Sequence, residues 1–477
     1  MCPGKKDCIS KRGEKRQKRV LCDSLRNLHI KFCQLHGIHM SYSTFCRLRP
    51  FWVVEPHVKD RQSCLCTCHE NMGLLVQKLY HLGIIKESSS QEVCKATVCD
   101  TTSKTCMYGE CEQCQLKAVS PVTETGMENK SFYYKWTTKL EQRTKADQTQ
   151  IKVKVTSKEK VEATVQDMLS IMNTELPRFR QHAYRVSHQN ESQNRMKSAL
   201  SQSDCLIVID FSENYLCKYG SEVQSVHFGA SKHQVTLHTA VLYYCKEKYE
   251  IGCESFCTVS ESLRHDASAV WAHLQPIMNF ISDNLPSIDT IHFWSDGPTT
   301  QYRNKRNFGI FSQIVSLWKY NIASWNFTES GHGKGPADGV GGSIKRYADS
   351  LVAHGHDITS ADELVSALKE KVSTHLFLIQ DADISTVDEQ FDTSKVKPLK
   401  GTMKLHQLTW TRGANNFLGV RYLSCLECPM DQVCHHYDAG GFTEINVVQP
   451  LRQETCMDAE DLPHDECILI LLNVFIV

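Results

Sequence analysis

The spacing of apolar residues predicts a helical region at the start of the chain. Five apolar side chains between residues 20 and 35 recur at helical intervals, namely Leu21, Leu25, Leu28, Phe32 and Leu35. Gly37 ends this helix, and Ser41 can cap a second, short helix that stops before Pro50. Two helices joined in this way are typical of a helix-turn-helix and equally of an ordinary helical hairpin.

The segment between residues 116 and 200 predicts a linker followed by two helices. Residues 116–150 are polar and contain one candidate strand at 131–136. From residue 157 the apolar positions again recur at helical spacing, and a second helical stretch covers about 182–200. We expect both helices to brace the domain that follows.

Residues 201–400 predict the main domain. Apolar, β-branched and aromatic runs predict strands at 206–210, 223–228, 234–244, 288–294 and 322–328. Helical spacing predicts two helices, at 268–285 and 308–320. Because several strands are apolar on both faces, we expect an α/β (α+β) fold in which helices flank a mixed sheet. The other divisions are an arm at 1–62, a cysteine-rich region at 63–115, the linker and bracing helices at 116–200, and a C-terminal segment at 401–477 that resembles a zinc knuckle.

Length and charge refine this picture. A chain of 477 residues is long enough for about two to four domains. Lysine plus arginine equals aspartate plus glutamate at 54 each, but residues 1–62 hold 14 basic and 5 acidic side chains. Such an arm suits a phosphate backbone or a nuclear-import signal, and equally a solvated tail. The apolar run 467–477 is about half as long as a membrane span, so we expect no membrane partner.

The 23 cysteines gather in clusters with histidines, and no N-terminal apolar stretch resembles a secretory signal. These features favour structural zinc over disulfides, although reduced cysteines also fill ordinary cores. The candidate zinc ligands are Cys64, Cys66, Cys68 and His69 in one set, Cys94, Cys99, Cys106, Cys111 and Cys114 in a second, and Cys425, Cys428, Cys434, His435 and His436 in a third. The first two sets can share ligands, and one of the two histidines suffices for the third.

Three acidic residues carry the chemistry that we expect. Asp210 ends the apolar run that starts at Cys205, Asp296 follows the run 291–294, and Asp338 lies in a glycine-rich turn that opens a helix. If the two strands are neighbours, Asp210 and Asp296 meet at one edge of the sheet, where crowded carboxylates favour Mg²⁺ or Mn²⁺. An acid at a strand end is also common without a metal, and Asp338 can serve only as a helix cap.

The glycine-rich run 330–346 predicts a contact to phosphate. Backbone amides at such a turn favour an anion, and His332 and Lys334 are placed to contact a phosphate or a leaving group. The spacing is not that of a Walker loop. The residues that follow Asp296 can grip DNA phosphates or form a solvated helix face, and the candidates are Gln301, Arg303 and Asn304.

Several motifs resemble those of an uncharacterised family of transposon-derived animal proteins. They are Asp210-Phe-Ser-Glu-Asn-Tyr, Ser295-Asp296-Gly-x3-Gln301-Tyr-x-Asn304, His332-Gly-Lys-Gly-x2-Asp338-Gly-x-Gly-Gly, Phe45-x2-Leu-Arg-Pro50 and the stretch from Cys64 to His69. The resemblance covers most of residues 18–440. Its core is similar to a ribonuclease-H-like transposase of the DDE/D type, which implies an acidic triad, divalent metals, a DNA substrate and residence in the nucleus.

These expectations favour a DNA transposase or nuclease that hydrolyses and transfers phosphodiester strands with two metal ions held by Asp210, Asp296 and Asp338. The main alternative is a catalytically inactive, domesticated nuclear protein that binds zinc and DNA. A cytoplasmic interaction scaffold held together by zinc is a third reading. A homo-oligomer is compatible with each of them.

Overall fold

The computed structural model describes residues 8–444 except for 12, 18, 21–24, 55–65, 145–148, 230–231, 247–249, 319, 392, 394–395, 397–398, 400 and 415–416. It divides into two units, Met1–Leu65 and Cys66–Val477. Three predicted features, Leu21, Cys64 and the apolar run 467–477, lie outside the described residues.

In the first unit, two helices form the predicted pair. α1 spans Leu25–His36 and α2 spans Tyr42–Leu48, and the Ser41 hydroxyl accepts a hydrogen bond from the Thr44 amide as the expected N-cap. The His29 and Phe45 rings pack between the helices with centroids 5.4 Å apart. Four short strands complete the described part of this unit, namely β1 Cys8–Lys11, β2 Glu14–Gln17, β3 Arg19–Val20 and β4 Val53–Val54.

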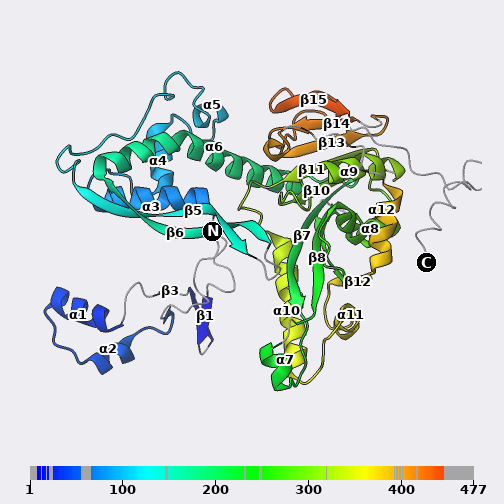
Figure 1. Cartoon of the computed structure of the whole chain (residues 1–477), viewed down its shortest axis with the longest axis horizontal. Helices are drawn as coiled ribbons and strands as arrows, with labels where there is room; N and C mark the ends of the chain where they lie inside the picture. Colours follow the sequence, from blue (N-terminus) through cyan, green and yellow to red (C-terminus); the bar gives the residue numbers. More distant parts are fainter. Residues whose placement is uncertain are drawn as a thin grey trace, which may run out of the picture. The chain divides into compact units, whose positions relative to one another are not determined.

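The second unit begins with helices that share one apolar core. They are α3 Thr67–His81, α4 Ser90–Thr97, α5 Lys104–Met107 and α6 Val165–Ser198. The core between α3 and α6 is made of Met72, Leu75, Val76 and Leu79 on one helix and Met168, Leu169, Met172 and Leu176 on the other. In Figure 1, α6 runs from these helices towards the large sheet.

The linker and bracing helices differ from the prediction. β5 Lys130–Thr144 and β6 Gln150–Thr164 pair as a long antiparallel ribbon, so the helix expected from residue 157 is wrong at its start. α6 then continues for 34 residues as one helix through Pro177 rather than as two. It begins at a capping box, because the Thr164 hydroxyl accepts from the Asp167 amide and the Asp167 carboxylate accepts from the Thr164 amide.

A nine-stranded mixed sheet forms the main body of the described chain. The sequence predicts a mixed sheet, but it located only four of these strands. The strands of the sheet are β7 Asp204–Leu216, β8 Gln234–Cys245, β9 Ile251–Ser260, β10 Thr290–Ser295, β11 Ile322–Phe327, β12 His375–Ile379, β13 Gln407–Thr411, β14 Phe417–Arg421 and β15 Asp438–Glu444. The order is β12-β9-β8-β7-β10-β11-β13-β14-β15. The pairs β7–β10, β10–β11 and β9–β12 are parallel, and the others are antiparallel.

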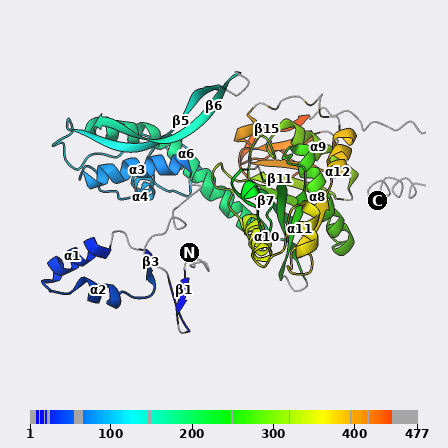
Figure 2. The ribbon, with the colours of Figure 1, turned by 60° about the horizontal axis from the view of Figure 1, so that its bottom comes forward.

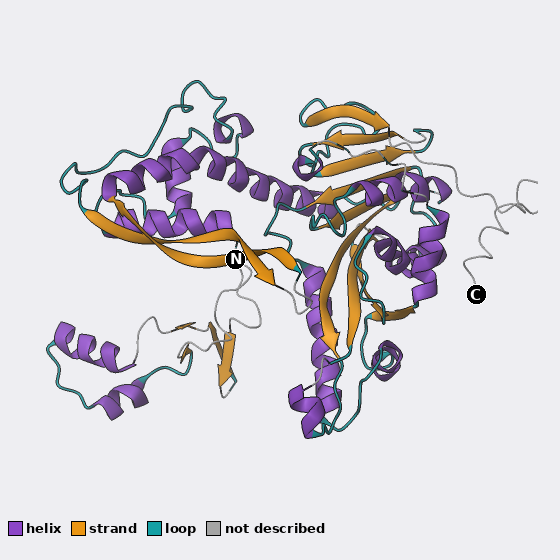
Figure 3. Cartoon of the chain, in the orientation of Figure 1, coloured by secondary structure: helices purple, strands orange, loops and turns teal. Residues whose placement is uncertain are grey.

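Helices cover both faces of this sheet (Figures 2 and 3), which explains why its central strands are buried on both faces. On one face, α8 Ala267–Asn284, α9 Lys305–Leu317 and α12 Asp381–Gln390 pack on Ile207 and Ile209. On the other face, α10 Pro336–Ala353 and α11 Ala361–Leu368 pack on Leu206 and Val208.

Three details depart from the predicted layout. Residues 224–229 form the short helix α7 (Gln224–Gly229) where a strand was expected, and β9 was not predicted. The C-terminal strands β13, β14 and β15 continue the main sheet, so the segment after residue 401 is not separate from it. Within the described part of the chain, no helix has both the length and the apolar character that crossing a membrane requires.

Candidate functional site: an acidic pocket beside a cluster of metal ligands

Strand pairing brings two of the predicted acids side by side. β10 runs parallel to β7 with Ser295 opposite Ile209, so the next residues, Asp296 and Asp210, are neighbours where β10 ends. β7 itself continues to Leu216. The prediction that Asp210 ends its strand is therefore wrong, but the two strands are neighbours, which was the condition for the two acids to meet.

Burial and neighbouring negative charge destabilise the charged form of both carboxyl groups. Burial, together with the charges of Asp296 and Asp338, raises the pKa of Asp210 to about 8. Burial and the charge of Asp338 also raise the pKa of Asp296 to about 6, against the opposing effect of Arg303. Oδ1 of Asp296 is buried and has no hydrogen-bond partner among the described residues. Such a group is costly to keep, and a bound cation would offset that cost.

Asp338 lies in the first turn of α10 and is exposed. Its Oδ2 accepts a hydrogen bond from the Gly335 amide at 2.8 Å, so in this structure Asp338 caps the helix. Its charge reaches both other acids, because it raises the pKa of Asp210 and of Asp296. The three carboxylates are nevertheless not among the groups of described ligands that come within 4.8 Å of one another.

A cavity of about 30 Å³ lies between the strand ends and the glycine-rich turn. Asp210, Asp296, His332 and Lys334 contribute to its lining. The turn lies very close to Asp296, because a Cβ added to Gly333 would be 2.6 Å from the Asp296 Cβ. Only glycine fits this contact without a shift, and the space that remains is enough for a water molecule or a small cation.

The predicted phosphate-contacting residues divide into buried and exposed ones. Arg303 is buried, and its guanidinium donates to the carbonyls of Met403 and Thr328 at 3.1 Å each. Asn304 caps α9 by accepting from the Asn307 amide and donates to the Gln301 carbonyl. Arg303 and Asn304 therefore make hydrogen bonds within the fold, and Lys334 is exposed beside the pocket.

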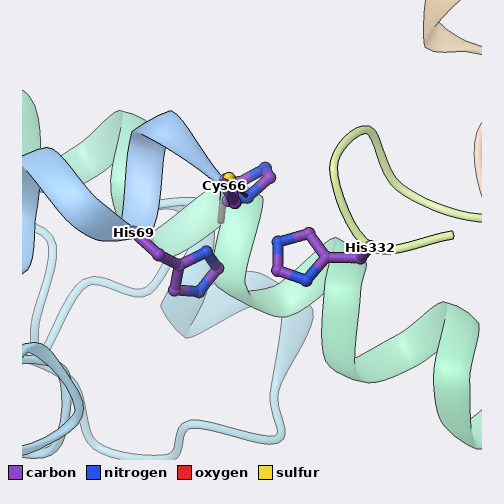
Figure 4. Close-up of side chains that lie close together, drawn as sticks. Cys66, His69 and His332 are labelled. Atoms are coloured by element: carbon purple, nitrogen blue, oxygen red, sulfur yellow. Dashed lines mark hydrogen bonds between the residues drawn. The ribbon is translucent and has the colours of Figure 1, made fainter. Parts of the chain in front are cut away.

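His332 belongs to a cluster that the sequence did not predict. It meets Cys66 and His69, from the start of α3, and His182, from α6, so that one ligand atom from each lies within 4.8 Å of the others. Figure 4 shows the His69 and His332 rings facing the same space beside Cys66. The Cys66 Sγ is 3.2 Å from Nε2 of His182, and the His69 and His332 ring centroids are 4.9 Å apart.

A buried carboxylate, that of Glu329, contacts the His182 ring of this cluster. It lies 2.9 Å from Nδ1 of His182 and 2.8 Å from Nε2 of His406, and it accepts from Arg185 at 3.1 Å. Burial opposes its charge, but these contacts hold the pKa of Glu329 far below its usual range. Although burial works against it, hydrogen bonds to the three imidazoles lower the pKa of Cys66 to about 3, which favours the thiolate that binds metal.

Two further groups have the composition of structural zinc sites. One consists of Cys99, Cys106, Cys111 and Cys114, and the other of Cys425, Cys428, Cys434 and His436. In the second group, Nδ1 of His436 lies 3.3 Å from the Cys428 Sγ, and the Tyr437 amide donates to the Cys434 Sγ. Buried Arg421 holds the ligand loop by donating to the carbonyls of Cys425 and Pro429. These cysteine-rich groups could each hold a zinc ion.

Several candidate zinc ligands lie outside the three groups. Cys94 is buried in the apolar core of α3 and α6, and burial raises its pKa to about 11. Cys68 points into a different cavity, beside Asn71 and Arg178. His435 is exposed, and His436 takes the fourth position of its group.

The sequence did not reveal His182 and Glu329 because their partners are far away along the chain. His182 is separated from Cys66 by 116 residues and from Glu329 by 147. Neither residue belongs to a local ligand motif. In the sequence, the one local sign of this cluster is Cys66-x2-His69, whose spacing is typical of a metal site at the start of a helix.

Comparison with known families places two parts of the chain. Residues 189–424 match a family described as a domain of unknown function (DUF8701), and residues 1–57 match another described as a domain of unknown function (DUF8699). The first match contains the three acids and His332 but not Cys66, His69 or His182. No curated protein matches the chain. No solved structure matches it either.

We expect that replacing Cys428 with serine removes about one zinc ion per chain, since a tetrahedral structural site needs all four of its ligands. Zinc in the purified protein, measured by plasma mass spectrometry, checks this. The control is Cys253→Ser, because Cys253 is exposed on β9 and belongs to none of the three groups. Equal zinc content in the two variants would contradict the assignment.

Proposed function

We propose that this chain is a metal-dependent transposase or endonuclease that cuts and joins DNA, with Asp210, Asp296 and Asp338 as its acidic triad. The observation that carries the proposal is the juxtaposition of Asp210 and Asp296 on neighbouring strands, where each is destabilised by burial and by nearby negative charge. Carboxyl groups with perturbed pKa values cluster at functional sites, and a metal ion between them would stabilise both charges.

The order of elements supports a ribonuclease-H-like core. Five strands run β9-β8-β7-β10-β11, with β8 antiparallel to both of its neighbours and β7, β10 and β11 parallel. α8 connects β9 to β10, α9 connects β10 to β11, and α10 follows β11. Asp210 lies on β7, Asp296 directly follows β10, and Asp338 lies in the first turn of α10. The resemblance implies an acidic triad, and we assign these three residues to it from their order along the chain.

The residues of the pocket fit Mg²⁺ or Mn²⁺. Such ions take oxygen ligands, and a bound cation would stabilise both the unpartnered Oδ1 of Asp296 and the buried carboxyl group of Asp210. Arg303 does not fill that role, because its hydrogen bonds go to backbone carbonyls. When bound as a pair, such ions supply Lewis-acid stabilisation of the attacking and leaving oxygens.

The protein's own groups would position the substrate. Lys334 is exposed at the pocket and can neutralise a phosphate, and the backbone amides of the glycine-rich turn can donate to its oxygens. Asp338 stands at the start of α10, and its side chain has to leave the Gly335 amide in order to join the other two acids.

The β5–β6 ribbon offers a surface for DNA. Its two faces differ, because even-numbered residues are mostly exposed and odd-numbered residues face inward along much of its length. The exposed face combines lysines with aromatic and apolar side chains and contains one acid, Glu162. The lysines are Lys130, Lys152, Lys154, Lys158 and Lys160, and the aromatic and apolar residues are Phe132, Tyr134, Trp136 and Leu140. Lys160 lies 4.5 Å from the centre of the Phe132 ring. A two-stranded basic ribbon fits a DNA groove, and aromatic rings add stacking to the attraction for phosphate.

A catalytically inactive zinc- and DNA-binding protein is the second candidate. It is favoured by the cap that holds the Asp338 carboxylate away from the other two acids. We propose the nucleus as the location in either case, because both candidates act on DNA, and a homo-oligomer is compatible with both.

We expect Asp210→Asn and Asp296→Asn to abolish Mn²⁺-dependent nicking of supercoiled plasmid, by at least about a hundredfold, because each removes a metal-binding charge. Binding to a fluorescent duplex, measured by anisotropy, should persist. The matched control is Asp289→Asn, since Asp289 lies just before the opposite end of β10. If the wild-type protein cuts no DNA with either metal but binds it, the inactive candidate is favoured.

We also expect Lys152→Gln with Lys154→Gln to weaken duplex binding and to reduce the slope of log affinity against log salt by up to about two, as expected when two phosphate contacts are lost. The charge-matched control is Lys139→Gln with Arg143→Gln, because those cations are paired with Glu159 and Glu141. The same loss in both double variants would contradict a specific role for the exposed face.

A further inference from the structure

We propose that Cys66, His69, His182 and His332 bind one zinc ion, and that this ion fixes the glycine-rich turn 331–335 against Asp296. This goes beyond the proposed DNA chemistry, because it assigns a metal site and a role in positioning the pocket. It rests on the four side chains, on the carboxylate behind them and on the contacts of the turn.

The four side chains can fill all four coordination positions of a zinc ion. One thiolate and three imidazoles make the four ligands that zinc takes in a structural site, and all four come from the protein. The His182, His69 and His332 rings have centroids between 4.9 and 5.3 Å apart. With no position left for water or substrate, the ion would act as a crosslink rather than as a catalyst.

Among the described residues, two imidazole nitrogens of the cluster lack the hydrogen bonds that buried polar atoms usually make. Nδ1 of His69 and Nε2 of His332 are buried without a hydrogen-bond partner in the described part of the chain. Buried nitrogen atoms of this kind are costly, and coordination of these rings to zinc would help to offset the cost.

Glu329 is not a zinc ligand in this proposal, but it contacts one of the ligands. Its contact with Nδ1 of His182 leaves Nε2 of that ring facing the Cys66 thiol. Metal-binding histidines usually have such a carboxylate partner, which fixes the tautomer and orients the ring. One zinc with one thiolate leaves a charge of +1, which the buried Glu329 carboxylate, also paired with Arg185, offsets in part.

The ion would join three distant segments at the edge of the acidic pocket. Cys66 and His69 belong to α3, His182 to α6, and His332 to the turn before α10. On one side of this turn, a Cβ added to Gly331 would lie 3.3 Å from the Cys66 Cβ. On the other side, one added to Gly333 would lie 2.6 Å from the Asp296 Cβ. The turn is thus held between the zinc ligands and an acid of the pocket.

The test measures zinc content and backbone exchange in the full chain. His69→Ala should lose one zinc per chain, and amide hydrogen exchange across residues 331–338 should accelerate about tenfold or more, as local opening becomes easier. His69→Cys keeps a soft ligand and should retain both zinc and slow exchange. The matched control is His81→Ala, because His81 is exposed at the end of the same helix.

Each outcome decides one part of the proposal. Unchanged zinc content in His69→Ala would overturn the site. Loss of one zinc with unchanged exchange across the turn would overturn the positioning role. Neither measurement needs DNA, so a protein that fails to cut DNA would leave this result intact.

Discussion

The structure depends on two half-buried carboxylates held side by side by the register of β7 and β10. A slip of one residue would separate Asp210 from Asp296, but it would also turn every apolar side chain of the strand to the opposite face. Because helices cover both faces of the sheet, such a slip is strongly disfavoured. Packing therefore keeps the two carboxyl groups close together, and burial together with nearby negative charge raises the pKa of both acids. We read this destabilisation of the charged forms as the requirement of a cation site.

The glycine-rich turn beside these acids is held in place by contacts on both of its sides. The turn that contains His332 contacts Asp296 on one side and Cys66 on the other, and Glu329, at its start, binds His182, Arg185 and His406. Through these contacts the long helix α6 joins the N-terminal helices of the second unit to the sheet. Folding of the region around α3 is thereby coupled to the geometry of the pocket. A zinc ion in the Cys66 cluster would make that coupling rigid.

Much of this architecture could be predicted from local patterns, and the failures have physical causes. Long apolar runs located β7, β8, β10 and β11, and Asp210 and Asp296 were expected to meet only if their strands were neighbours, which the pairing of β7 and β10 shows. The pattern was silent for β9, whose early residues alternate with polar side chains such as Glu254, and it did not reveal that α6 continues through Pro177. Arg303 was expected on the surface, but Gly297 leaves room for its guanidinium, which would lie 2.6 Å from an added Cβ. His182 and Glu329 act through partners more than a hundred residues away, and no local spacing encodes that contact.

The most direct test of the acidic pocket is a calorimetric titration of the zinc-loaded protein with Mn²⁺ in the absence of DNA. The account predicts saturable binding by the wild-type chain and its loss in Asp296→Asn, with the zinc content unchanged. Absence of saturable binding by the wild-type chain, or equal binding by the variant, would contradict the claim that these carboxylates form a cation site.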